Sequence, residues 1–146
     1  MKIKNYSSSV AVSKSISSIE ILLVEAGAKT ISKFYMDDNK IAGFLFQLKV
    51  GESLVTFKLP SNPKAVEKVL IAQLIKPRKE TIKRVIEQAE KTSWKLLHEW
   101  VHIQISMVQM EQAEATQVFM PYLYDGVNDR TLFQTLKENN FKQLVQ

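Results

Sequence analysis

A long helical pattern is the feature that most constrains the fold of this 146-residue chain. From about Glu80 to about Met120, apolar residues recur at intervals of three and four positions, which is the spacing of one face of an α-helix. An unbroken helix over this segment would span roughly 60 Å. A domain of this size does not need so long a helix. We therefore expect it either to kink or to pack at its far end against another subunit.

The apolar face of this predicted helix is wider than a single stripe. One row of positions follows a 4-3 repeat like the seam of a coiled coil, and a second row runs beside it. The first row comprises Ile82, Ile86, Ala89, Ser93, Leu96, Trp100, Ile103, Met107 and Met110, and the second comprises Trp94, Leu97, Val101, Ile105 and Val108. One small sheet would leave part of this surface uncovered. We therefore expect a homo-oligomer that forms through the long helix.

Before this helix, the pattern changes from helical spacing to alternation. Residues 16–26 have helical spacing and end at Gly27. Three segments then follow, separated by turn residues. Residues 29–36 are rich in β-branched and aromatic side chains, and in 41–50 and 55–59 apolar and polar positions alternate. This arrangement predicts a short helix followed by an antiparallel meander of three strands with one apolar face.

The second half of the chain is predicted to be helical. Asn62 and Pro63 are suited to the cap and the first position of a helix that Pro77 stops, and a last amphipathic helix is expected from Thr131 to Val145. The fold class is therefore α+β: an N-terminal helix, a three-stranded antiparallel sheet and a helical half dominated by one long helix. We expect a single domain over residues 1–146, with the helix and β-meander at about 10–60 and the helical half at about 62–146.

Composition excludes several functional classes. The chain has no cysteine, so disulfides, thiolate nucleophiles and cysteine-based zinc sites are excluded. The N-terminus lacks the apolar region of a signal peptide, and no run approaches the roughly 18 apolar residues of a membrane span. Glycines are isolated, so no phosphate-cradling glycine loop is present. We expect a soluble protein of the cytoplasm with no membrane partner and no cofactor.

Two histidines suggest a metal site. His98, Glu99 and His102 form a His-Glu-x-x-His string, in which two imidazoles on one helix face bind zinc and the glutamate acts as general base for a bound water. The chain has only these two histidines, so a third ligand would have to be a carboxylate. Asp125, Asp129 or Glu138 could supply it. The alternative is that both histidines lie on the polar, solvent-exposed face of the helix and bind no metal.

A cluster of cations brackets Pro77, where two helices are predicted to meet. The net charge is +5 with a pI of about 9.4, which favours anionic partners. With Trp94, or Tyr122 and Tyr124, available for stacking, the cluster would suit an anionic nucleotide or single-stranded nucleic acid. The alternative is a solvated corner in which Glu80 pairs with Arg84 four residues on. The cluster comprises Lys76, Arg78, Lys79, Lys83 and Arg84.

Five parts of the chain carry a resemblance to known proteins: 19–28, Leu59-Pro60, 90–101, Phe119–Tyr124, and 131–133 with 141–144. These segments resemble a family of small phage- and prophage-encoded proteins of uncharacterised function. The resemblance covers nearly the whole chain, but the shared residues are of the packing kind. It implies a phage accessory protein that acts in the cytoplasm of a bacterial host, and it supplies no catalytic residues.

These observations lead to three functional hypotheses. The first is a non-enzymatic phage accessory protein that sequesters an anionic nucleotide-derived defence signal and so acts against host defence. The second is a nucleic-acid-binding phage protein. The third is a zinc-dependent hydrolase that uses His98 and His102 as ligands and Glu99 as base.

Overall fold

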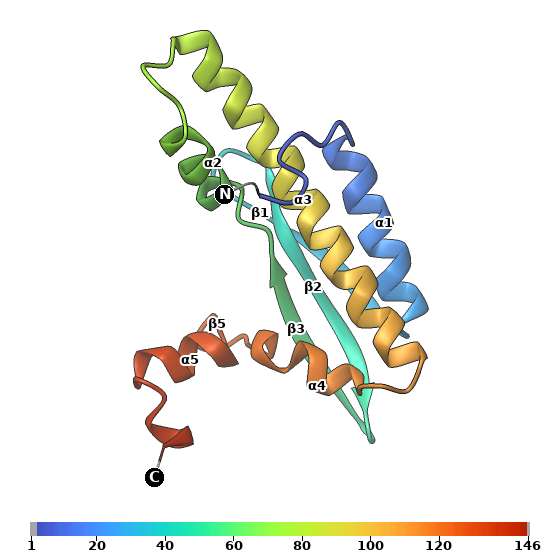
Figure 1. Ribbon diagram of the computed structural model, residues 1–146. Coiled ribbons are helices and arrows are strands. Elements are labelled where there is room, and N and C mark those ends of the chain that lie inside the picture. The colour runs from blue at the N-terminus through green and yellow to red at the C-terminus, as the bar shows by residue number, and fades with distance from the viewer. Residues whose placement is uncertain (1–2, 146) are drawn as a thin grey trace. The chain divides into compact units, whose positions relative to one another are not determined.

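The computed structural model describes residues 3–145 and confirms the α+β class (Figure 1). No helix among these residues is both long enough and apolar enough to span a membrane. The helices are α1 (Val12–Glu25), α2 (Pro63–Ala72), α3 (Lys79–Gln109), α4 (Ala115–Phe119) and α5 (Leu132–Glu138), with 3-10 turns η1 (Met120–Tyr122) and η2 (Lys142–Leu144). The strands are β1 (Thr30–Tyr35), β2 (Ile41–Val50), β3 (Ser53–Pro60), β4 (Tyr124–Asp125) and β5 (Arg130–Thr131).

The chain divides into two compact units, each formed from two stretches of sequence. The first unit combines the residues up to Leu22 with Ser61–Ile103, and the second combines Leu23–Pro60 with the residues from Gln104 onward. Helices α1 and α3 each continue from one unit into the other. The single domain over residues 1–146 stays a prediction.

The second unit contains the predicted meander. β2 pairs antiparallel with both β1 and β3, and its alternation places Phe44, Phe46 and Leu48 on a buried face. The rings of Phe46 and Phe57 stack at a centroid distance of 5.4 Å, and Phe119 meets Phe46 edge-on at 5.2 Å. An aromatic cluster therefore joins α4 to the sheet inside this unit.

Gly43 lies in β2, between β1 and β3. It pairs with Phe34 of β1 and Pro60 of β3, and the β1 register shifts immediately after Phe34. A Cβ atom at this position would lie 2.3 Å from the carbonyl oxygen of Leu59 and 2.7 Å from the Phe34 ring. Only glycine fits this position without movement of the neighbouring backbone.

The first unit contains α2, the larger part of α3 and an N-terminal segment that lies along α3. Gln88 donates a side-chain hydrogen bond to the Ser8 carbonyl (2.9 Å), and the Thr92 hydroxyl donates one to the Asn5 carbonyl (2.8 Å). These bonds satisfy backbone groups of a segment that has no ladder partners of its own.

Helix α2 begins as predicted. Asn62 is the N-cap, its side chain accepts a hydrogen bond from the Ala65 N–H at 3.2 Å, and Pro63 follows at the first position. We expect Asn62→Ala to lower the stability of this helix by about 1 kcal/mol, because it leaves an N–H without a partner. Faster hydrogen exchange of the Ala65 amide would show the loss. Asn62→Asp keeps an acceptor and serves as control, and equal exchange rates in the two variants would contradict the prediction.

The predicted long helix ends earlier than expected. The prediction of one helix up to about Met120 is wrong beyond Gln109. Glu111 adopts a left-handed conformation, with φ of 59°, and this ends α3. The Gln112 N–H donates to the Met107 carbonyl and the Glu111 N–H donates to the Val108 carbonyl, which is the bonding of a Schellman motif. Glu114 then caps the separate helix α4, and its N–H donates to the Gln117 side chain.

The last predicted helix is also shorter than expected. It begins as predicted near Thr131, whose hydroxyl accepts a hydrogen bond from the Gln134 N–H (3.3 Å), but it ends at Glu138 rather than Val145. Asn140 and Phe141 have positive φ, and the Phe141 N–H donates to the Leu136 carbonyl. An asparagine that tolerates the left-handed conformation therefore stops α5.

Candidate anion-binding site

Most of the net positive charge lies in one segment of the first unit. Between Ser61 and Lys91 there are eight lysines and arginines against four glutamates, an excess of four in a chain whose total net charge is +5. The remaining residues are close to neutral. The segment comprises α2, the loop after it and the start of α3, so the charge excess is local rather than spread over the chain.

The loop between α2 and α3 borders an open hollow of about 600 Å³ in the first unit. Figure 1 shows this loop joining green α2 to the yellow-green start of α3. The predicted cations Lys76, Arg78 and Arg84 line the hollow, whereas Lys79 and Lys83 are exposed but do not line it. The full lining is Leu74, Ile75, Lys76, Pro77, Arg78, Glu80, Thr81 and Arg84.

The cations of this corner are available for a ligand. Within residues 3–145, none of the five predicted cations takes part in an ion pair, and the expected pair between Glu80 and Arg84 does not form. The first turn of α3 lies on the same hollow, and free N–H groups at a helix start favour an anion. The arrangement can hold a phosphate by charge-assisted hydrogen bonds.

The structure does not bring the predicted aromatic residue to this surface. Trp94 is 0% exposed, so its ring packs in the interior instead of stacking on a ligand. Tyr124 lies in the second unit, and its hydroxyl donates a hydrogen bond to Asp129 at 2.6 Å. This bond raises the pKa of Tyr124. Among the described residues that line the hollow, none is aromatic.

His98 and His102 lie as the spacing predicts but are not arranged as two ligands of one ion. Their rings are parallel, with an interplanar angle of 4° and centroids 6.3 Å apart. A metal ion lies in the plane of each imidazole that binds it, and two stacked parallel planes do not meet at one point. Burial, together with the charges of Lys95 and His102, lowers the pKa of His98 and favours the neutral ring.

Glu99 has a structural role in the first unit. Its carboxylate accepts a hydrogen bond from the Asn5 side chain at 2.9 Å and pairs with Lys4 at 3.3 Å and Lys95 at 3.9 Å. The bond from Asn5 is the main cause of the lowered pKa of this carboxyl. A general base accepts the proton through an oxygen within hydrogen-bond reach of the water, whereas the carboxylate of Glu99 is held by Asn5, Lys4 and Lys95, and its lowered pKa makes it a weaker base.

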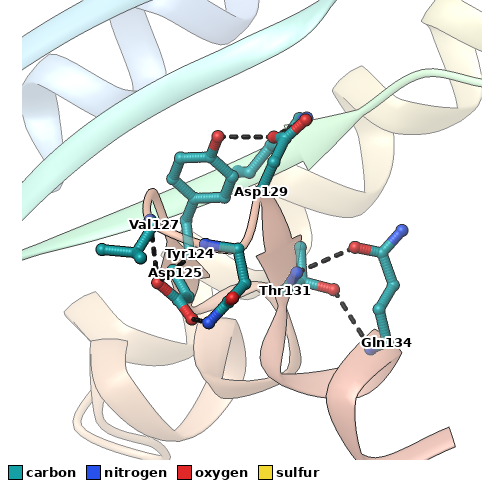
Figure 2. Close-up of polar contacts among 8 residues, drawn as sticks. Tyr124, Asp125, Val127, Asp129, Thr131 and Gln134 are labelled. Atoms are coloured by element: carbon teal, nitrogen blue, oxygen red, sulfur yellow. Dashed lines mark hydrogen bonds and ion pairs between the residues drawn. The ribbon is translucent and has the colours of Figure 1, made fainter. Parts of the chain in front are cut away.

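The carboxylates considered as a third zinc ligand are all engaged within the second unit, and Figure 2 shows the contacts of Asp125 and Asp129. Asp125 accepts hydrogen bonds from the Asn128 side chain and from the Val127 N–H, and these bonds lower its pKa. Asp129 accepts from Tyr124 and pairs with Lys58, and Glu138 pairs with Arg130. In the part of the chain that the structure describes, no three histidine, aspartate or glutamate side chains are grouped to hold a metal ion.

Sequence reasoning missed the apolar part of the hollow. Leu74, Ile75 and Pro77 line it together with the cations, whereas the sequence pattern indicates only that Pro77 stops a helix. The sequence around Ile75 could have indicated this surface. Ile75 falls outside the helical pattern and directly precedes the basic cluster, which is an unusual position for an isoleucine that packs in a core.

The comparisons with known proteins add no relative: no protein-family model, no curated protein and no solved structure matches the chain.

Proposed function

We propose that this chain is a non-enzymatic binding protein that captures a phosphate-bearing ligand at the corner between α2 and α3. The observation that carries the proposal is the hollow lined by Lys76, Arg78 and Arg84, none of which is paired with a carboxylate of residues 3–145. Unpaired cations beside a helix start attract phosphate more strongly than other surface groups do.

A nucleotide is the ligand that we favour for this hollow. The volume of the hollow, about 600 Å³, lies within the roughly 300–1,000 Å³ that is typical of small-molecule binding sites. The resemblance to phage and prophage proteins supports the more specific proposal that the ligand is a nucleotide-derived defence signal and that the protein sequesters it in the bacterial cytoplasm.

Calorimetric titration with linear and cyclic nucleotides tests this proposal directly. We expect at least one nucleotide to bind with an affinity that falls as salt is added, because the contacts to its phosphate are ionic. The absence of heat across the whole panel at low salt would contradict nucleotide capture.

A second candidate function is nucleic-acid binding, and it is favoured by the cations outside the hollow. Lys64, Lys68, Lys79 and Lys83 are exposed along α2 and the start of α3. A phosphodiester backbone would contact several of them at once and release counterions, so affinity would fall steeply with salt. Gel shifts at low salt with single- and double-stranded DNA and RNA test it, and the absence of any shift would remove this candidate.

We further propose that the chain forms a homo-oligomer through α3. Three residues of the predicted seam are exposed on the single chain, whereas Trp94, Val101 and Ile105 are buried: Ile86 is 37% exposed, Ile103 58% and Met110 73%. Pairing with the same helix of a second copy would remove these exposed side chains from water.

Light scattering of Ile103→Asp tests this assembly. The wild-type chain is expected to have a mass above 16.7 kDa, and the variant is expected to return to that mass because a carboxylate on the seam would be buried without a partner. The exposure of Ile103 lets the single chain tolerate the change. Ile21→Asp, at a similarly exposed isoleucine of α1, is the matched control. A wild-type mass of 16.7 kDa would defeat the proposal.

A further inference from the structure

The hollow at the corner has a cationic part and an apolar part. Lys76, Arg78 and Arg84 form the first, and Leu74, Ile75 and Pro77 form the second; Glu80 and Thr81 complete the lining, so three cations face one carboxylate. Ile75 is 92% exposed, which is an unfavourable environment for a large aliphatic side chain. A bare inorganic phosphate would use only the cations, so the apolar part indicates a ligand with an apolar face of its own.

We infer that the apolar part receives the base of a nucleotide whose phosphate lies on the cations. The inference rests on the proposed function and adds a second recognition element to the same site. A base has a flat face that is poorly solvated, and packing it on Ile75 and Pro77 removes apolar surface of both partners from water. Pro77 is rigid and needs no ordering when the base binds.

The composition of the hollow also explains why aliphatic residues would take this role. Base recognition commonly uses an aromatic ring, but the nearest aromatic side chain along α3, Trp94, is fully buried. Lys76, between Ile75 and Pro77, has a left-handed backbone with φ of 44°. This conformation is rare for a residue that precedes proline. It occurs at Lys76, where the apolar part of the hollow adjoins the cationic part.

The partner chemistry is that of a nucleotide unit, either free or within a single strand. A lipid surface fits less well, because membrane binding scales with buried apolar area and Ile75 is the single strongly exposed apolar side chain among the residues that line the hollow. A nucleotide needs only one apolar contact surface beside its phosphate, which matches the two parts of the hollow.

Calorimetry with matched ligands tests the inference. Wild-type protein is titrated with ribose 5-phosphate and with AMP, GMP, CMP and UMP, and then with a short single strand and its abasic counterpart. We expect about tenfold tighter binding of at least one base-bearing ligand than of its baseless partner, in the range of a single buried contact. The free nucleotides and the strand distinguish the two sources of the unit.

Ile75→Ser is expected to abolish this difference, measured as the ratio of the affinities for the nucleotide and for ribose 5-phosphate. Its exposed position lets the fold tolerate the change. Val127→Ser is the matched control, because Val127 is 93% exposed in a loop of the second unit, and it is expected to retain the wild-type preference.

The possible outcomes separate the inference from the proposed function. If no phosphate compound binds, the proposed function fails and the inference fails with it. If ribose 5-phosphate binds as tightly as every nucleotide, the phosphate site stands and the inference is overturned. If Ile75→Ser keeps the tenfold preference, the base lies elsewhere and the inference is likewise overturned.

Discussion

Gly43→Ala is expected to lower the free energy of unfolding by about 3 kcal/mol, at the upper end of the range for overpacked sites. The added Cβ would lie 2.3 Å from the Leu59 carbonyl oxygen and 2.7 Å from the Phe34 ring. The ring could turn aside, but the carbonyl belongs to β3, and moving it would disturb the β2–β3 ladder. Because the main obstacle is backbone, relaxation can recover little of the lost stability.

Urea unfolding followed by circular dichroism measures this effect. Gly126→Ala is the matched control, since its Cβ would meet only the Tyr124 ring at an ordinary 3.7 Å and the backbone does not require glycine. We expect the control to stay within about 0.5 kcal/mol of wild type. Equal midpoints for the two variants would show that β2 and β3 do not pair in the register described.

Reversing the charge of both arginines in the hollow is expected to weaken phosphate binding at least about a hundredfold. Each of Arg78 and Arg84 would contribute a charge-assisted hydrogen bond, worth about 1.5–3 kcal/mol, and each glutamate adds repulsion. Both side chains are exposed, so Arg78→Glu with Arg84→Glu leaves the fold intact. Titration with the best nucleotide, or with a single strand, measures the loss.

The control for this variant has the same net charge. Lys29→Glu with Lys49→Glu reverses two exposed cations outside the corner. If the loss reflects only total charge, the control will weaken binding as much as the arginine variant does, and the site at the corner is then wrong. If the control binds as wild type while the arginine variant does not, the corner carries the binding.

The elements of the fold were predictable where local sequence decides them. The alternation of β2 determines which residues share a face, and Phe44, Phe46 and Leu48 are buried together as that alternation predicts. Gly27 ends α1 with a positive φ of 94°, which glycine adopts without strain. Asn62 and Pro63 begin α2 because capping depends on neighbouring backbone groups alone.

The end of α3 was not predictable in the same way. Glutamate favours helices and rarely adopts the left-handed conformation, yet Glu111 does so and α3 stops before it. The apolar pattern continued past this point because α4 also has an apolar face that must be buried, with Phe119 in the aromatic cluster. Two helices with compatible spacing therefore looked like one.

The sequence by itself determined the fold class, the strand alternation and the position of the basic cluster. All of these depend on residues close together in the chain, where helix and strand periodicity and local charge density act directly. The burial of Trp94, the engagement of Glu99 by Asn5 and the close approach at Gly43 were decided only by the tertiary structure. Each depends on a contact with a distant segment, and periodicity carries no information about which distant group will fill a given space.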